Sequence, residues 1–271
     1  MAHSLAARCR PLLLLLLWAA LLIPGRALAA PCLPNVASRP LQLASLPVSG
    51  STGIVDLTFL GHASFLIESA AGVTIVTDYN GYIRPPFIPD IVTMNHAHPT
   101  HYTDHPEPEI KYVLRGWDTG SGPPHWDLRY RDVRIRNVLT NIRDYGYGGT
   151  EYGGNSIFVF EIADLCIAHL SHLHHTLTQE HLADLGQIDV LLTPVDGAYT
   201  LSQTDMLTVI EQIHPALVVP MHFFGPSVLQ RFLDRVGERY PVKTSESPRV
   251  ALSRAMLPKT TEILVLPGNG F

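Results

Sequence analysis

Asn95-His96-Ala97-His98-Pro99-Thr100-His101 is the stretch of this chain that carries most information about its fold and chemistry. It directly follows Ile91–Met94, a short apolar run typical of a buried strand. Side chains alternate along an extended segment, so His96 and His98 are expected to point to the same side. Neutral imidazole is a good ligand for Zn²⁺. The stretch therefore predicts a metal site just beyond the end of a strand.

The other histidines support this interpretation. The chain has 14 histidines, and eight of them lie in the two windows 96–105 and 169–175. His169 and His172 follow a predicted strand, and His222 follows another, at the ends where loops of an α/β sheet converge on a ligand. We expect a first metal site from His96, His98 and His169, and a second from His101 and His222, with His172 either a ligand or a structural residue.

The pattern outside these windows predicts strands first and then strands alternating with helices. Segments 117–129 and 144–155 are rich in Gly, Pro and aromatic residues and predict loops. Helices are expected from Thr178 to Gly186, from Ser202 and from Pro226, because cap residues precede apolar stripes there. This order favours two mixed sheets covered by helices. The predicted strands are Ile54–Leu60, Ser64–Glu68, Val73–Thr77, Ile91–Met94, Val133–Val138, Ser156–Ile162, Leu165–Ala168, Ile188–Leu192, Leu217–Val219 and Ile263–Leu266.

The first 29 residues have the features of a signal peptide. Arg8 and Arg10 precede the apolar run Leu12–Ile23, and Ala27-Leu28-Ala29 offers a cleavage site. Twelve apolar residues span about 18 Å as a helix, too short for a hydrocarbon core of about 30 Å. We therefore expect export to the periplasm or the medium of a bacterium; the alternative is an uncleaved anchor. Residues 30–52 predict an irregular segment, and 53–271 one domain.

Charge and cysteine content narrow the function classes. Without the leader, the chain has 16 basic and 24 acidic residues, a formal charge of −8, and no basic cluster is present. This excludes nucleic acid as an expected partner and favours a small-molecule substrate. No later stretch is apolar enough to predict membrane insertion. Export would permit a disulfide between Cys32 and Cys166, while the apolar surroundings of Cys166 are equally compatible with a buried thiol.

Several of these elements, in their order and spacing, resemble the metallo-β-lactamase superfamily, above all its lactonase-like and phosphodiesterase-like branches. The resemblance runs from about Val55 to Phe224. It implies a four-layer αββα sandwich, with two mixed sheets flanked by helices, and a metal-dependent hydrolase domain over 53–271. The matching segments are Leu60–Phe65, Val73–Asp78, His96–His101, Ile167–His169, Ile188–Pro194 and Val218–His222.

Two residues depart from the family pattern. Thr100 stands where the H-x-H-x-D-H motif has an aspartate, and His172 stands where a bridging aspartate usually follows. Both carboxylates of the second metal are therefore replaced, and His172 could substitute only as a nitrogen ligand. As catalytic or positioning residues we expect Asp78, which the resemblance places beside a ligand; Asp104, one helical turn after His101; and His62. Asp196, at a strand end, is a further candidate.

A three-histidine site with an open position would leave the metal its full charge. It would lower the pKa of bound water from 15.7 towards about 7, and the resulting hydroxide would attack an ester, lactone or phosphodiester bond. We expect one or two Zn²⁺ ions, with Mn²⁺, Fe²⁺ and Ni²⁺ as alternatives. The competing hypotheses are a non-catalytic metal-binding protein of the cell envelope and, third, a redox enzyme with histidine-bound iron.

Overall fold

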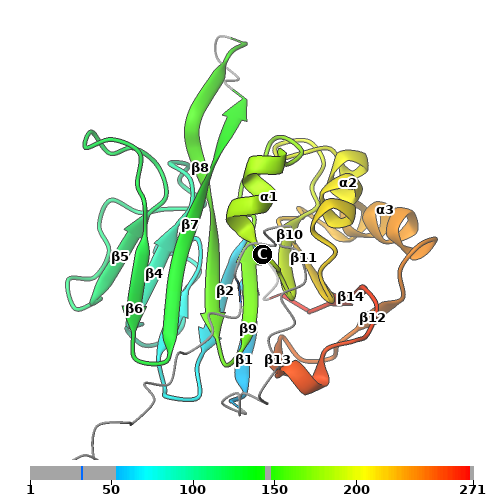
Figure 1. Ribbon diagram of the computed structural model, residues 1–271, viewed down its shortest axis with the longest axis horizontal. Helices are drawn as coiled ribbons and strands as arrows, with labels where there is room; N and C mark the ends of the chain where they lie inside the picture. Colours follow the sequence, from blue (N-terminus) through cyan, green and yellow to red (C-terminus); the bar gives the residue numbers. More distant parts are fainter. Residues whose placement is uncertain (1–31, 33–52, 144–147, 269–271) are drawn as a thin grey trace, which may run out of the picture.

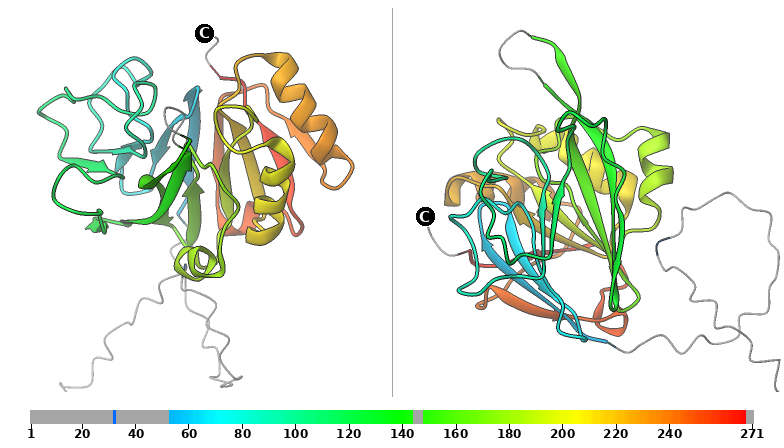
Figure 2. Two further views of the ribbon diagram at one scale, coloured as in Figure 1. Left: turned by 90° about the horizontal axis from the view of Figure 1, so that it is seen from above. Right: turned by 90° about the vertical axis from the view of Figure 1, so that its left-hand side faces the viewer.

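The computed structural model describes residues 32, 53–143 and 148–268. In this part of the chain two mixed β-sheets pack face to face (Figure 1, Figure 2). Antiparallel pairs dominate the first sheet, with parallel pairs at β3, β4 and β5. Its strands, in spatial order, are β13 (Arg249–Leu252), β1 (Val55–Gly61), β2 (Ser64–Glu68), β3 (Thr74–Val76), β4 (Ile91–Met94) and β5 (Tyr112–Arg115).

The second sheet is parallel from β12 to β9 and antiparallel from β9 to β6. Its order is β12 (Val242–Thr244), β14 (Glu262–Val265), β11 (Leu217–Met221), β10 (Val190–Pro194), β9 (Leu165–His169), β8 (Thr150–Ile162), β7 (Val133–Arg143) and β6 (Asp127–Tyr130). The α-helices are α1 (Gln179–Leu185), α2 (Gln203–Ile213) and α3 (Pro226–Gly237), followed by a 3₁₀ turn, η1 (Arg254–Met256). The predicted α/β sandwich with two mixed sheets is confirmed.

The main hydrophobic core fills the space between the two sheets. Strand β1 alternates buried and half-buried residues along its length, so Leu57 and Phe59 point inwards while Asp56 and Thr58 do not. Phe59 stacks on Phe65 of β2 with ring centroids 4.8 Å apart. Full burial of such side chains contributes about 1.5–3 kcal/mol each to stability. This core fixes the separation of the strand ends that carry the histidines.

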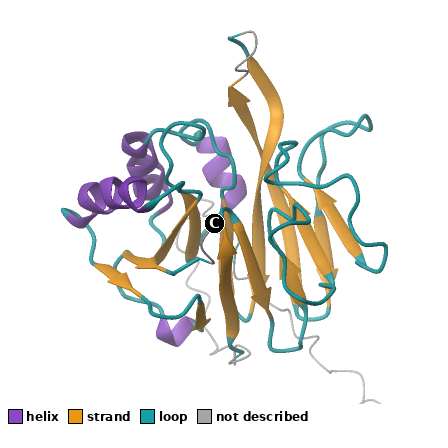
Figure 3. Ribbon diagram, turned by 180° about the vertical axis from the view of Figure 1, so that it is seen from behind, coloured by secondary structure: helices purple, strands orange, loops and turns teal. Residues whose placement is uncertain are grey.

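The three α-helices cover the outer face of the second sheet (Figure 3). Helix α1 begins at Thr178, whose side chain accepts a hydrogen bond from the His181 amide, and ends at Gly186 with φ of 67°. Helix α2 is capped by Ser202 in the same way. The predicted helix boundaries are therefore confirmed. Their apolar stripes pack on the sheet through Leu185, Met206, Val209, Ile210, Phe232 and Val236.

The outer face of the first sheet is covered by loops, whereas we expected helices on both outer faces. Tyr79, Ile110 and Trp117 pack there on Val92 and Met94. In the described residues no α-helix lies on this side. The covering segments contain Pro85, Pro86, Pro89, Pro99, Pro106 and Pro108. Proline removes an amide donor and clashes with the preceding helical turn, so these segments cannot continue as helices.

Two predicted loops contain strands. Residues 127–130 form β6 and pair with β7, and β8 begins at Thr150, inside the segment 144–155. Positions 144–147 of that segment lie outside the described residues. Strands β5, β12 and β13 were not predicted, since each has only three or four residues and little alternation of buried and exposed positions.

Cys32 and Cys166 form a disulfide, which settles the choice between a disulfide and a buried thiol. The bond joins positions 134 residues apart and attaches Cys32 to the second residue of β9, in the hydrophobic cluster that also contains Leu185 of α1. Arg136 adds to this contact by donating hydrogen bonds to the carbonyl oxygens of Asp184 and Leu185. No helix among the described residues is long and apolar enough to cross a membrane.

Candidate metal centre

Six histidine rings meet where strand ends of both sheets converge. We call this group the histidine cluster. Neighbouring ring centroids in it lie 4.3–6.3 Å apart. The members are His62 after β1; His96, His98 and His101 after β4; His172 after β9; and His222 after β11. The structure thus brings together six of the histidines that the sequence analysis singled out.

Four residues at these strand ends have a left-handed backbone. His62 has φ of 51°, Asp78 of 44°, Ser171 of 47° and His222 of 54°. Non-glycine residues rarely adopt such values, and when they do they collect at functional sites, where surrounding contacts hold them. One such contact joins two of these four residues directly: the His222 amide donates a hydrogen bond of 2.6 Å to the His62 carbonyl oxygen. The four turns place their side chains between the sheets.

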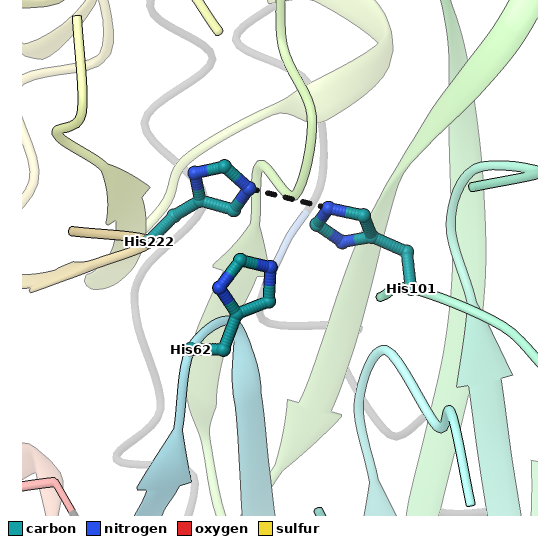
Figure 4. A group of neighbouring side chains, drawn as sticks. All are labelled: His62, His101 and His222. Carbon is teal, nitrogen blue, oxygen red and sulfur yellow. Dashed lines mark hydrogen bonds between the residues drawn. The ribbon is translucent and has the colours of Figure 1, made fainter. Parts of the chain in front are cut away.

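His62, His101 and His222 form the tightest part of the cluster (Figure 4). Each offers one ring nitrogen, and these atoms lie within 4.8 Å of one another. All three residues are buried. Their rings point towards one another from β1, from the loop after β4 and from β11. We call these residues the histidine triad.

Two buried carboxylates determine which nitrogen each ring presents. Asp78 Oδ2 lies 2.6 Å from His101 Nδ1, and Asp196 Oδ1 lies 3.0 Å from His222 Nδ1. A carboxylate accepts hydrogen bonds, so each Nδ1 donates, and in the neutral form of each ring the lone pair lies on Nε2. The two Nε2 atoms are only 3.3 Å apart.

This arrangement of lone pairs fits a bound cation. Burial, followed by the nearby His222, lowers the pKa of His101 well below the usual value, so the ring is neutral. Burial, followed by His222, also lowers the pKa of His62 to about 3. Lone pairs on two nitrogens that face each other at this distance would repel unless a proton or a cation lay between them. Neutral imidazole is the form that coordinates a transition metal.

The two carboxylates are held by further donors. Asp78 also accepts hydrogen bonds from Ser171 Oγ at 2.7 Å and from the Asn95 amide. Burial raises the pKa of Asp78, but these donors favour its ionised form. Burial acts in the same direction on Asp196, but hydrogen bonds from His222, the Thr200 hydroxyl and the Ala198 amide outweigh it and lower the pKa of Asp196. Both residues therefore act as hydrogen-bonded supports for the histidine triad.

His96 and His98 lie on the open side of the cluster. His96 Nδ1 donates to the Gly154 carbonyl oxygen at 2.7 Å, which leaves its Nε2 as an acceptor. His98 Nδ1 lies 2.9 Å from Thr100 Oγ1, so the threonine in place of the expected aspartate contacts a histidine ring. Both rings line a cavity of about 570 Å³ together with Thr100, Ile142, Arg143, His172, His174, Tyr199, His222 and Phe224.

His169 is not brought into the cluster, although the sequence predicted it as a ligand. Its Nε2 lies 2.8 Å from the Ala63 carbonyl oxygen, and its Nδ1 lies 3.1 Å from Asn95 Nδ2. Both ring nitrogens are therefore engaged by protein groups, with Nε2 donating and Nδ1 accepting. The ring connects the end of β9 to the turn between β1 and β2. In the triad a different histidine, His62, lies beside His101 and His222.

Asp104 also lies apart from the cluster. We expected a helical turn to place it beside His101, but 102–107 contains no helix and Asp104 is exposed. It lines a separate hollow of about 340 Å³ with Arg115 and Trp117. The carboxylate that contacts His101 is Asp78, as the resemblance implied.

The fold is an α/β sandwich of two sheets with a group of histidines at the converging strand ends. Comparison with known proteins identifies the family. Residues 56–222 match the beta-lactamase superfamily domain, and the chain belongs to this family. A UPF0173 metal-dependent hydrolase of Carboxydothermus hydrogenoformans is 27% identical over 192 residues, which cover 62% of this chain and 84% of that protein. One from Salinibacter ruber is 25% identical over 212 residues, 66% of this chain and 89% of that protein.

Solved structures give the same fold. A Thermotoga maritima protein described as a Zn-dependent hydrolase of the metallo-beta-lactamase superfamily superposes with a TM-score of 0.58 at 26% identity. The match covers 78% of this chain and 98% of that one. A metal-dependent hydrolase from Parabacteroides distasonis has a TM-score of 0.51 at 16% identity, covering 67% and 88%, and supports the fold alone.

Proposed function

We propose that this protein is a zinc-dependent hydrolase of esters or lactones that carry an apolar group beside the cleaved bond. That it is a metal-dependent hydrolase accords with its family and with the names of its relatives. The observation that carries the proposal is the pair of facing Nε2 atoms of His101 and His222, each fixed by a carboxylate behind it.

His62, His101 and His222 would hold the metal, with His96 and His98 available from the open side. A bound Zn²⁺ would supply Lewis acidity and lower the pKa of a water molecule towards neutrality. Asp78 and Asp196 orient the rings and stabilise the Nδ1–H tautomers. The remaining work of the chain is to bind the substrate beside this site and to exclude bulk water from it.

The cavity favours an apolar substrate. Ile142, Tyr199 and Phe224 line it, and in the described residues no Asp or Glu does. Arg143 is the single Lys or Arg side chain among those lining residues, and its guanidinium donates to the carbonyl oxygens of Ala198 and Thr200. One cation already engaged by the protein is a weak match for a phosphodiester, which usually needs several donors to its charged oxygens. We therefore rank esters and lactones first and phosphodiesters second.

The experiment combines metal content with turnover. The protein is purified without added metal or a His tag, its metal is measured by plasma mass spectrometry, and panels of esters, lactones and phosphodiesters are then screened. We expect bound zinc and ester or lactone hydrolysis, both lost in His101→Ala and His222→Ala. Both should be kept in His125→Ala, because His125 is exposed and does not line the cavity. A native protein free of metal, or a zinc-loaded protein inactive on all panels, would contradict the proposal.

A second candidate is a non-catalytic metal-binding protein. The absence of a carboxylate among the described cavity-lining residues favours it, because no general base then faces a substrate. Tight zinc binding by the histidine triad without turnover on any panel would support this candidate. Activity that falls together with bound zinc in His101→Ala would exclude it.

We also propose that the protein is exported to a bacterial periplasm or to the medium. Two observations support this: the signal-like pattern of the first 29 residues and the disulfide between Cys32 and Cys166. Disulfides form and persist in oxidising compartments and are rare in the cytosol. Mass spectrometry of the protein from periplasmic and cytosolic fractions tests this; a chain that starts near residue 30, found only in the exported fraction, is the expected result.

A further inference from the structure

We infer that His172 is a hydrogen-bond donor aimed into the cavity, and that it serves the substrate oxygen on which negative charge develops during hydrolysis. His172 stands where the family pattern has an acidic metal ligand, so its role must be derived from this chain. The part that concerns catalysis rests on the proposed function. The part that concerns the proton position rests on the hydrogen bonds alone.

A backbone amide determines which nitrogen of His174 carries the proton. The Arg143 amide donates a hydrogen bond of 2.8 Å to His174 Nδ1. His174 Nδ1 must therefore carry a lone pair. A lone pair on Nδ1 excludes the doubly protonated form, so the His174 ring is neutral and carries its single proton on Nε2.

The proton on His174 Nε2 in turn determines which nitrogen of His172 carries its proton. His174 Nε2 lies 2.7 Å from His172 Nδ1. Since His174 Nε2 is the donor, His172 Nδ1 is the acceptor, and the neutral His172 ring carries its proton on Nε2. Because His172 Nδ1 accepts this hydrogen bond, the doubly protonated form is excluded for His172 as well. A proton on Nε2 occupies the position through which this ring would otherwise coordinate a metal.

His172 thus differs from its neighbours. His96, His101 and His222 each donate from Nδ1 to a carbonyl or carboxylate oxygen, so that the neutral ring presents its lone pair at Nε2. His172 presents an N–H group instead. The first kind of ring holds a cation, whereas the second stabilises an anion.

The position of His172 suits this role. It lines the cavity together with His222, and its ring is perpendicular to those of His101 and His222, with centroids 4.8 Å and 5.2 Å away. Nδ1 faces His174, so Nε2 lies on the part of the ring turned away from it. A substrate bound beside the triad would therefore meet the Nε2–H group of His172.

In ester hydrolysis the oxygen of water forms a bond to the carbonyl carbon, and the carbonyl electron pair moves onto its oxygen. His172 donates a hydrogen bond to that oxygen and keeps its proton throughout. When the carbonyl re-forms, the alcohol leaves with a proton that came from the water. Removing one such donor typically lowers kcat by about 10²- to 10³-fold.

The first test locates the proton without using activity. Long-range ¹H–¹⁵N correlation spectra are recorded on histidine-labelled, zinc-loaded full-length protein at pH 7.5, and the His172 signals are assigned by comparison with His172→Gln. We expect a protonated Nε2 and an unprotonated Nδ1 for His172, and a change of this pattern in His174→Leu. A His172 ring with a metal-bound or unprotonated Nε2 would overturn the inference.

The second test uses hydrolysis of 4-nitrophenyl acetate by zinc-loaded protein. We expect His172→Phe to lower kcat about 10²- to 10³-fold with bound zinc and KM little changed. We expect His172→Gln, whose amide can donate into the cavity, to recover at least tenfold. Loss of zinc in His172→Phe, or no recovery in His172→Gln, would identify a ligand or a structural residue instead.

A matched control distinguishes an effect on the orientation of His172 from a general loss of structure around β7. His175 accepts a hydrogen bond from the Asn141 amide of the same strand as Arg143, and it does not line the cavity. His174→Leu should lower kcat at least tenfold, while His175→Leu should leave kcat unchanged. Equal effects of both variants on kcat would overturn the inference that His174 orients the His172 proton. If wild-type protein binds zinc but hydrolyses nothing, the proposed function fails, and the proton position still decides the first part of this inference.

Discussion

Replacing Asp78 by asparagine tests whether the buried carboxylates prepare the histidine triad for a metal. Asp78 accepts three hydrogen bonds: from His101 Nδ1 at 2.6 Å, from Ser171 Oγ at 2.7 Å and from the Asn95 amide at 3.2 Å. An asparagine has one oxygen and one NH₂ group on these two positions. In either orientation, the NH₂ group faces a group that donates a hydrogen bond to the wild-type carboxylate.

The magnitude follows from these contacts. A hydrogen bond to a charged group contributes about 1.5–3 kcal/mol, so the metal-free Asp78→Asn protein should lose about 1–3 kcal/mol of unfolding free energy. Loss of a carboxylate that orients a ligating histidine typically costs 10- to 100-fold in metal affinity. We therefore expect the dissociation constant for zinc to rise by about 10- to 100-fold, which corresponds to about 1.4–2.7 kcal/mol.

Zinc affinity is measured by competition with a chromophoric chelator, and stability by urea denaturation of the metal-free protein. Asp189→Asn is the matched control, because Asp189 is also a buried carboxylate, accepts from the Cys166 amide and pairs with Arg254, but lies before the other end of β10. It should lose similar stability and keep its zinc affinity. A zinc affinity of Asp78→Asn within threefold of wild type, or an equal loss in Asp189→Asn, would refute the reasoning.

Four other outcomes are expected. Zinc at 1,000 times its dissociation constant should stabilise the chelator-treated protein by about 4 kcal/mol, and a denaturation midpoint that ignores zinc would contradict this. Cys32→Ser should lower the unfolding free energy by up to about 5 kcal/mol, because the loop closed by the disulfide is long; equal stability of oxidised and reduced wild type would contradict this. The unfolding free energy of the metal-free protein should fall from pH 7.5 to 5. Because the folded-state pKa of His62 is lowered to about 3, at pH 5 the unfolded chain binds a proton that the folded chain does not, which lowers the unfolding free energy by about 2 kcal/mol. Phe224→Ala should raise KM for a butyrate ester more than for an acetate ester, and equal changes would argue against an apolar subsite.

The elements and the strand-end histidines were predictable because their signals are local. An apolar run that ends at a polar residue identifies a strand end, and this predicted the neighbourhoods of His96, His101 and His222. Cap residues predicted helix α1 from Thr178 to Gly186 within one residue. Such signals depend on neighbours within a few positions along the chain.

The orientation of individual rings was not predictable. All five residues of β9 are buried, so the strand shows no alternation that would tell which sheet face His169 points to. The sequence therefore could not separate His169, engaged with Ala63 and Asn95, from the histidines of the cluster. The missing helical turn at Asp104 could have been predicted, because Pro99, Pro106 and Pro108 surround it.

The disulfide between Cys32 and Cys166 closes the chain from residue 32 to residue 166 into a covalent ring and leaves the residues after Cys166 outside it. Strands β1 to β8 lie wholly inside the covalent ring, together with His62 and His101, while the α-helices and His222 lie outside it. Partial opening of the carboxyl-terminal part can carry His222 away, but it leaves the ring and two triad members closed. We expect slow hydrogen exchange to persist longest inside the ring and metal release to follow opening of the outer part. If His222 binds the metal as proposed, metal exchange would require only the part of the chain after Cys166 to loosen.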